Sequence, residues 1–290
     1  MGCQATICRM NKGNSAKAQG VNHYENFPVA SFLCPPALRP AITAIYWFAR
    51  TADDLADEGN ALPQARLEDL QTYRSDLMAC IAGQPFSNRW KEVFDRLQPV
   101  ISKFSLPVNL LYDLLNAFEQ DVVKTRYASQ AELLSYCNWS ANPVGRLLLH
   151  LYGVQDAASL QQSDCICTAL QLINFWQDLS IDLAAGRIYL PADSFAKHSV
   201  EETQLLARQI NPNTTALVAA QVAWAKSLMK RGSPLAKTVP GRAGWELRLV
   251  IQGGLRIAEK IEQIGFQTLR QRPKLKTWDV MVMTWRALLM

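Results

Sequence analysis

Apolar side chains recur every three or four residues along most of the chain, beginning near Asn22. This spacing places them on one face of an α-helix, whereas the strict alternation of a half-buried strand is nearly absent. The sequence therefore predicts an all-α protein. The predicted helices cover residues 39–56, 64–82, 88–101, 109–124, 131–152, 164–183, 200–208, 214–231, 244–265 and 277–289.

Proline and glycine separate several of these helices. Pro40 marks the beginning of the first one, and Gly59 and Pro63 follow it, as is typical where helices begin and end. Residues 1–20 are polar and rich in small side chains, which predicts a disordered leader. Because we find no internal repeat or later change of composition, residues 21–290 are predicted to form one helical domain.

The composition is that of a folded protein with a mild positive charge. The 290 residues include 49% hydrophobic and 19% charged side chains, and 30 Lys and Arg against 25 Asp and Glu give a net charge of +5. This excess suits a phosphate-bearing ligand or an anionic membrane surface. It is small and scattered, with no nucleic-acid-binding signature, so we exclude a nucleic-acid partner.

The seven cysteines are odd in number and unevenly spaced, and no signal peptide precedes them. This pattern predicts reduced thiols in a cytoplasmic protein. No apolar run approaches the roughly 20 residues that a helix needs to cross a bilayer. Peripheral contact with the cytoplasmic membrane stays open.

A first acidic stretch follows the apolar segment at residues 41–49. Asp53 and Asp57 are four residues apart, so their carboxylates project from one helix face. Such carboxylates repel each other, and a hard divalent cation is the natural compensation. The alternative is a solvated helix end that carries acidic residues by chance.

A second acidic stretch lies within an otherwise apolar helix. Asn174, Asp178 and Asp182 advance in steps of four, which predicts three oxygen ligands along one helix face. Unpaired carboxylates are costly in such an apolar setting. The alternative to metal binding is a buried ion pair with Arg187 or Arg146.

The two acidic stretches together indicate a more specific chemistry. Mg²⁺ usually binds through a few carboxylates and the phosphate oxygens of a substrate. Bound ions would neutralise the charge that develops on a departing diphosphate. The carbocation left behind requires a dry pocket lined by aromatic and aliphatic side chains.

Around these stretches, residues 23–265 resemble the squalene/phytoene synthase family. The family's first motif carries an arginine three residues before Asp-x-x-x-Asp, matched here by Arg50, Asp53 and Asp57. The second motif runs from Asn-x-x-x-Asp-x-x-x-Asp into Gly-Arg-x-Tyr-x-Pro. It is matched by Asn174, Asp178, Asp182, Gly186, Arg187, Tyr189 and Pro191. The resemblance implies a single-domain isoprenoid synthase fold with a central active-site cavity, Mg²⁺ as cofactor and an isoprenoid diphosphate as substrate.

The resemblance also implies which other side chains form the site. Tyr136 matches an active-site tyrosine in the segment Tyr-Cys-x-x-x-Ala-x-x-Val-Gly. The expected substrate-binding residues are Asn26, Phe27, Tyr46, Arg50, Arg126, Arg187 and Tyr189. For Phe27 and Tyr46 the alternative is core packing, and for Arg126 it is a helix-end cation.

Within the family, the amino-acid sequences of several segments are most similar to those of the hopanoid-pathway branch. Members of that branch convert presqualene diphosphate and water to hydroxysqualene and diphosphate, a reaction for which NADPH is not expected. Gln177 stands where squalene synthases often carry arginine, and Asn142 belongs to a turn that usually contains glycine. Because amides can hold water, we predict that Asn142, Gln177 or Tyr136 positions the attacking water.

Two other functions remain open at this point. The first is head-to-head condensation of prenyl diphosphates to presqualene diphosphate, squalene or phytoene. The second is a catalytically silent relative that serves as an assembly or membrane-docking subunit, which the intact aspartates of both motifs argue against.

The last residues, 274–290, are apolar with a few basic side chains. They predict a helix that rests on a membrane interface, or one that packs on the core or on a second copy. The resemblance is compatible with a monomer or a homodimer and with contacts to enzymes upstream and downstream in the pathway.

Overall fold

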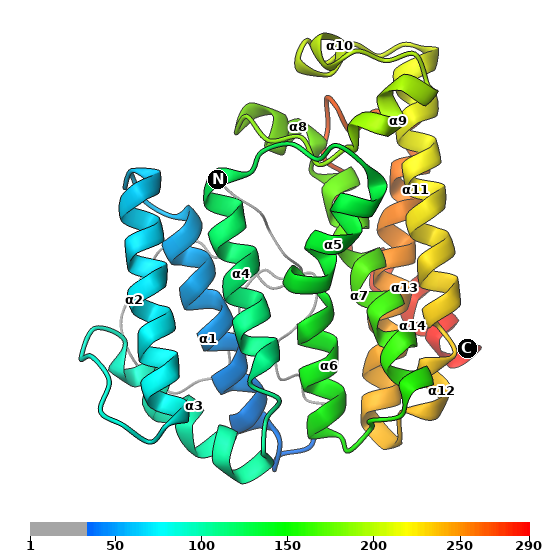
Figure 1. Ribbon diagram of the computed structural model, residues 1–290. Helices are drawn as coiled ribbons and strands as arrows, with labels where there is room; N and C mark the ends of the chain where they lie inside the picture. Colours follow the sequence, from blue (N-terminus) through cyan, green and yellow to red (C-terminus); the bar gives the residue numbers. More distant parts are fainter. Residues whose placement is uncertain (1–33) are drawn as a thin grey trace.

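The computed structural model describes residues 34–290, which form a bundle of mostly long, roughly parallel helices (Figure 1). The helices are α1 (Arg39–Asp57), α2 (Pro63–Ile81), α3 (Lys91–Phe104), α4 (Asn109–Val123), α5 (Gln130–Ser140), α6 (Asn142–Leu151), α7 (Ala157–Gln177), α8 (Leu179–Ala184), α9 (Ala192–Lys197), α10 (Glu202–Leu206), α11 (Pro212–Gly232), α12 (Leu235–Thr238), α13 (Gly241–Gln263) and α14 (Thr277–Leu288). These residues contain no strand, and their one backbone bridge joins Arg126 to Ile188. The predicted all-α class is therefore confirmed.

Local sequence signals account for where several long helices begin. The side chain of Asp156 accepts a hydrogen bond from the Ser159 amide at the beginning of α7. The side chain of Asn211 accepts a hydrogen bond from the Thr214 amide at the beginning of α11, where Pro212 occupies the first turn. Such caps satisfy backbone amides that have no partner inside the helix.

Two helices that the sequence predicts as continuous are each interrupted in the structure. The helix predicted for residues 131–152 is interrupted at Ala141 and forms α5 and α6. Pro143 lies at the beginning of α6, where its missing amide hydrogen costs least. The helix predicted for residues 164–183 begins earlier, at Ala157, and is interrupted at Asp178.

Helix α7 lies at the centre of the bundle, and α5, α6, α11, α12 and α13 contact it. The contact between α7 and α11 is the most extensive of these. A Cβ atom on Gly232 would lie 2.5 Å from the backbone oxygen of Gln162. Glycine is therefore required for this close approach of the two helices.

The short helices lie at one end of the bundle. Helices α8, α9 and α10 are found near the top of Figure 1, at the end where α1 also finishes. No helix in residues 34–290 has the length and hydropathy needed to cross a bilayer. The described cysteines all carry free thiols.

Candidate active site

The first acidic stretch forms the last turn of α1 and is organised by Arg50. The Arg50 guanidinium lies 3.1 Å from the Asp53 carboxylate and 2.9 Å from that of Glu58. The Asp53 side chain is only 13% exposed, whereas Asp54 beside it is 40% exposed. A solvated helix end therefore describes Asp54 and Glu58 but not Asp53.

The environment of Asp53 disfavours its charged form. Burial raises the pKa of this carboxyl well above its usual range, and Arg50 opposes the shift only in part. Asp57 and Asp121 raise the same pKa further because they are negative neighbours. Burial and neighbouring carboxylates thus make the ionised form of Asp53 costly although Arg50 contacts it.

Arg187 joins the first acidic stretch to the second. Its Nη2 atom lies 3.2 Å from Asp57 Oδ1 and donates to the backbone oxygen of Asp121 at 3.3 Å. The Arg187 amide donates to the backbone oxygen of Asp182 at 2.8 Å. One residue therefore holds together α1, α4 and the end of the second motif.

The second acidic stretch spans the junction of α7 and α8. Asp178 lies between these helices with φ −99° and ψ 10°, yet its amide still bonds to the Asn174 oxygen and its own oxygen accepts from the Asp182 amide. The step of four residues is therefore kept across the break. Asp178 and Asp182 are buried, and Asn174 is half-buried.

Asp178 has an ion-pair partner, which is Arg272 rather than Arg187 or Arg146. Both oxygens of Asp178 contact the Arg272 guanidinium, and the Nη2–Oδ2 distance is 3.2 Å. Arg146 instead pairs with Asp164 at 2.6 Å. Arg272 thus supplies a counter-charge to the second stretch from the segment between α13 and α14.

Tyr136 connects the acidic residues to a group of stacked aromatic rings. Its hydroxyl donates to Asp121 Oδ2 at 2.8 Å, and both side chains are buried. The rings of Phe175 and Tyr189 are stacked with their centroids 3.8 Å apart, and the centroid of Tyr136 lies 6.4 Å from that of Tyr189. Tyr127 stacks on Tyr189 at 5.7 Å. These rings place a large aromatic surface next to Asp121.

The other predicted polar residues have partners within the protein. Asn142 donates to Asn138 at 2.8 Å and accepts from Thr168 at 3.0 Å. Gln177 donates to the backbone oxygen of Pro273 at 2.7 Å.

Arg126 forms polar contacts with two other segments of the chain. It pairs with Glu202 at 2.8 Å and donates to the backbone oxygen of Gly186 at 2.6 Å. These contacts fasten Arg126 to the loop after α8 and to α10. Asn26 and Phe27 lie outside the described residues.

An apolar cavity of about 270 Å³ lies between α1, α6, α7 and α13. Its lining includes Tyr46 and Ala49 of α1, Leu170 of α7 and Val250 of α13. Asp53 follows Tyr46 by seven residues and Ala49 by four, which places all three on one face of α1. The cavity-lining face of this helix therefore continues into the acidic turn.

Comparison with known proteins agrees with this arrangement. The family model of squalene/phytoene synthase matches residues 21–279. The chain belongs to the squalene/phytoene synthase family. The match covers both acidic stretches, the aromatic group and the cavity lining.

Individual members of the squalene/phytoene synthase family extend the similarity over most of the chain. Hydroxysqualene synthase from Sinorhizobium fredii is 32% identical over 87% of this chain and 83% of its own length. Phytoene synthase from Thermus thermophilus is 28% identical over 89% of this chain and 86% of its own. The crystal structure of squalene synthase HpnC from Alicyclobacillus acidocaldarius is 35% identical and superposes with a TM-score of 0.78, covering 84% of this chain and 90% of that one. These likenesses confirm the predicted isoprenoid synthase fold.

The acidic residues of this squalene/phytoene synthase fit a hard divalent cation. Asp53, Asp57 and Asp121 offer oxygen ligands, and burial, followed by the negative charge of Asp57 and Asp121, raises the pKa of Asp53. Within residues 34–290, no three His, Cys, Asp or Glu side chains are grouped closely enough to hold an ion by themselves. Phosphate oxygens and water would complete the ligands, as they usually do for Mg²⁺.

Arg272 is the residue of the site that the sequence did not predict, and Asp121, which with Arg126 and Tyr127 resembles a family pattern, carried no assigned role. Asp121 lies on the last turn of α4, more than 60 residues from Asp53, and is one of three acidic residues in that helix, so its spacing alone does not point to the site. Arg272 stands among several basic residues in a loop. Both are brought to the site by packing between distant segments.

Proposed function

We propose that this squalene/phytoene synthase is a magnesium-dependent hydroxysqualene synthase, which converts presqualene diphosphate and water to hydroxysqualene and diphosphate. The observation that carries the proposal is the similarity to a hydroxysqualene synthase over nearly the whole chain. Asp53, one helical turn beyond the cavity-lining Ala49 on α1, supports it, because carboxylates next to an apolar cavity suit a substrate with an anionic head and a long hydrocarbon tail.

The first chemical step is heterolysis of the bond between the carbinyl carbon and the diphosphate oxygen. The electron pair leaves with the diphosphate, and a cyclopropylcarbinyl cation remains. Asp53 and Asp57, with Asp178 and Asp182, would hold Mg²⁺, which when bound acts as a Lewis acid toward the leaving diphosphate. Arg187 would add a fixed positive charge beside Asp57.

The second step requires that only one water reaches the rearranged cation. The apolar lining would keep other water away from the hydrocarbon tail of the substrate, and Tyr46, which lines the cavity, would supply an aromatic ring beside the cation. Water adds to the cation and loses a proton, which gives the alcohol.

Among the three residues predicted to position water, Tyr136 has the strongest support. Its hydroxyl already contacts the acidic group through Asp121, whereas Gln177 bonds to Pro273. We propose Tyr136 as the residue that positions the water. Tyr136→Phe should then shift the product from alcohol toward hydrocarbon or rearranged alkenes, and an unchanged product ratio would overturn this assignment.

The deciding experiment is incubation of the purified protein with presqualene diphosphate and Mg²⁺ in the absence of NADPH. Mass analysis should show hydroxysqualene, and chelation of the metal should stop its formation. Intact presqualene diphosphate after incubation, or a hydrocarbon as the sole product, would exclude the proposed reaction.

Head-to-head condensation is the second candidate, because a phytoene synthase is 28% identical over 89% of the chain. Separate incubations with farnesyl and geranylgeranyl diphosphate, with and without NADPH, test it. Formation of presqualene diphosphate, squalene or phytoene would favour this reaction. Magnesium-dependent release of diphosphate from any of these substrates would rule out a catalytically silent subunit.

A further inference from the structure

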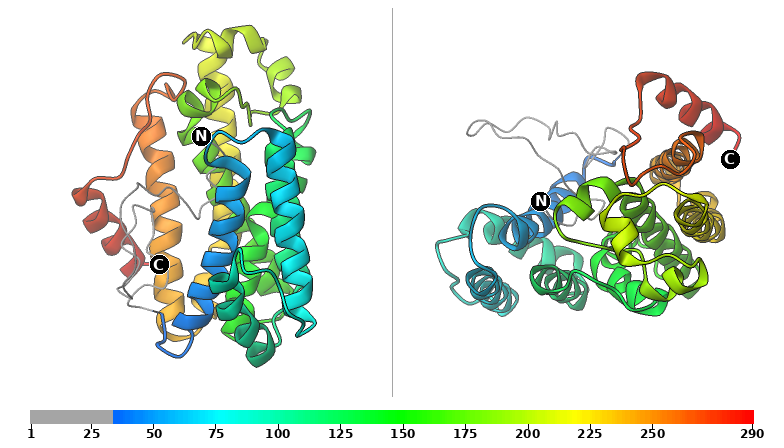
Figure 2. Two further views of the ribbon diagram at one scale, coloured as in Figure 1. Left: turned by 90° about the vertical axis from the view of Figure 1, so that its left-hand side faces the viewer. Right: turned by 90° about the horizontal axis from the view of Figure 1, so that it is seen from above.

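Helix α14 is docked on the bundle with a buried carboxylate on its inner face and several large apolar side chains on its outer face. It lies on the outer side of α13, at the edge of the molecule (Figure 2). Its buried residues are Asp279, Met283 and Ala287, which are four residues apart and form one face. Met283 and Ala287 pack inward as in an ordinary amphipathic helix, whereas a buried carboxylate and exposed large apolar side chains depart from that pattern.

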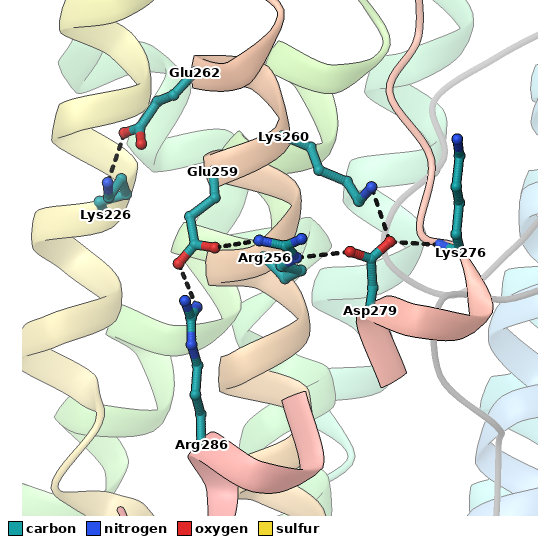
Figure 3. Close-up of polar contacts among 8 residues, drawn as sticks. All are labelled: Lys226, Arg256, Glu259, Lys260, Glu262, Lys276, Asp279 and Arg286. Carbon is teal, nitrogen blue, oxygen red and sulfur yellow. Dashed lines mark hydrogen bonds and ion pairs between the residues drawn. The ribbon is translucent and has the colours of Figure 1, made fainter. Parts of the chain in front are cut away.

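Ion pairs hold the inner face of α14 on α13 (Figure 3). The carboxylate of Asp279 lies 2.7 Å from Arg256 and 2.8 Å from Lys260, and its side chain is only 3% exposed. Arg286 pairs with Glu259, which also pairs with Arg256. Because these pairs fix the rotation of α14, the helix cannot turn its apolar face toward the core.

The outer face of α14 is a stripe of large apolar side chains. Trp278, Met281, Trp285 and Leu288 follow one another at intervals of three or four residues, on the side opposite Asp279. Their exposed fractions run from 54% for Leu288 to 66% for Trp278. Exposed apolar side chains gathered in this way mark an interaction surface.

Charge next to the stripe indicates what kind of partner covers it. Arg270, Lys274 and Lys276 directly precede α14 and are exposed. Asp279, the only acidic residue in 264–290, is buried in its ion pairs. A second copy of the chain docked stripe to stripe would bring these like charges together, whereas anionic lipid headgroups attract them.

We propose that the outer face of α14 binds an anionic lipid bilayer, with the stripe inserted at the level of the headgroups. Tryptophan suits that depth because its ring is apolar and its N–H can meet water. The first half of α13 lines the cavity, and its second half carries α14. Binding would therefore bring the lipid surface close to the helix that encloses the cavity.

Vesicle flotation of the full chain tests this proposal without any enzyme assay. Vesicles of equal parts phosphatidylcholine and phosphatidylglycerol should carry the protein, and vesicles of phosphatidylcholine alone should carry much less. Replacing Trp278 and Trp285 by serine should weaken binding at least about tenfold, since it removes the largest inserted side chains. Lys274→Glu with Lys276→Glu should weaken it as well, and added salt should have the same effect on the unmodified protein.

A matched control is Leu62→Ser, which removes an apolar side chain that is 75% exposed but lies far along the chain from α14. This variant should bind the vesicles like the unmodified protein. Circular dichroism checks that the tryptophan variant keeps its helices.

The proposal is overturned if the tryptophan variant floats as well as the unmodified protein, or if neither binds anionic vesicles. It is also overturned if light scattering shows a dimer without lipid that the tryptophan variant converts to a monomer. None of these outcomes depends on which diphosphate the enzyme uses.

Discussion

Neighbouring carboxylates at the end of α1 occupy opposite environments. Asp53 lies on the helix face that continues from the cavity lining and is 13% exposed, while the side chain of Asp54 is three times as exposed, at 40%. One step along a helix turns a side chain by about 100°, which is enough to move it from the site to the solvent. The same arginine, Arg50, contacts both.

This difference makes Asp53 and Asp54 a matched pair for mutagenesis. Asp53→Asn should lower magnesium-dependent turnover at least about a hundredfold, or about 2.7 kcal/mol in activation free energy. Asp54→Asn should change turnover little, because its side chain is the more exposed of the two and does not lie on the cavity-lining face. Steady-state kinetics of both variants with presqualene diphosphate measures this difference. Nearly equal rates would contradict a metal-binding role for Asp53.

Asp178 depends on a counter-charge from a distant loop. Arg272→Gln would leave this buried carboxylate without its ion-pair partner, so we expect the free energy of unfolding to fall by about 3 kcal/mol. If Asp178 also binds the metal, saturating Mg²⁺ should recover part of that loss, since the cation replaces the guanidinium.

Urea denaturation with and without Mg²⁺ measures both effects. Arg270→Gln is the control, because Arg270 is exposed and donates only to the backbone oxygen of Arg208. A loss of stability that Mg²⁺ does not change would place Asp178 in a purely structural ion pair.

At the scale of elements, interruptions of the helices decide where the site residues lie, and ion pairs help to decide where α14 packs. The break at Asp178 divides the second motif between α7 and α8, and the break at Ala141 lets α6 take its own direction along the cavity. Helix α14 is held by ion pairs in addition to the burial of Met283 and Ala287. Its attachment should therefore depend on pH in a way that core packing does not.

Asp279 allows that dependence to be worked out. Burial alone would raise its pKa, but hydrogen bonds from Lys260, the Lys276 amide and Arg256 outweigh burial and lower the pKa from 3.8 to about 2. A carboxyl with a lowered pKa stabilises the folded state above its unfolded pKa and loses that contribution as the pH falls. Docking of α14 should thus weaken below pH 3.8 as Asp279 takes up its proton.

Hydrogen exchange of the α14 amides measures this effect. At about pH 6, Asp279→Asn should lower the opening free energy of α14 by about 2 kcal/mol. The difference between variant and unmodified protein should shrink as the pH approaches about 3. A difference that stays constant over this range would contradict the ion-pair account.

At the scale of the whole molecule, the bundle joins a charged end to an apolar interior. Helix α1 connects the two, since Tyr46 and Ala49 line the cavity and Asp53 lies one turn beyond. The head and the tail of a substrate would therefore be bound by different parts of the protein. Substitutions in the cavity should affect only the tail.

Ala243→Phe tests this separation. Ala243 is a buried residue of α13 that lines the cavity, and a phenyl ring there would fill much of the 270 Å³. Turnover of a C30 diphosphate should fall at least about tenfold. Inhibition by inorganic diphosphate with Mg²⁺ should stay unchanged, because that ligand needs only the acidic end. Equal loss of both would show that the substitution disturbs the whole site.

The sequence by itself determined the helical class, most of the long helices and the candidate acidic stretches. These features depend on residues close together in the chain, such as the spacing of apolar side chains around Phe48 or the four-residue step from Asp53 to Asp57. The tertiary structure alone decided that Asp121 joins Asp53, that Arg272 neutralises Asp178, and that α14 turns its apolar side outward. Each of these depends on contacts between segments far apart in the chain, which local periodicity does not encode.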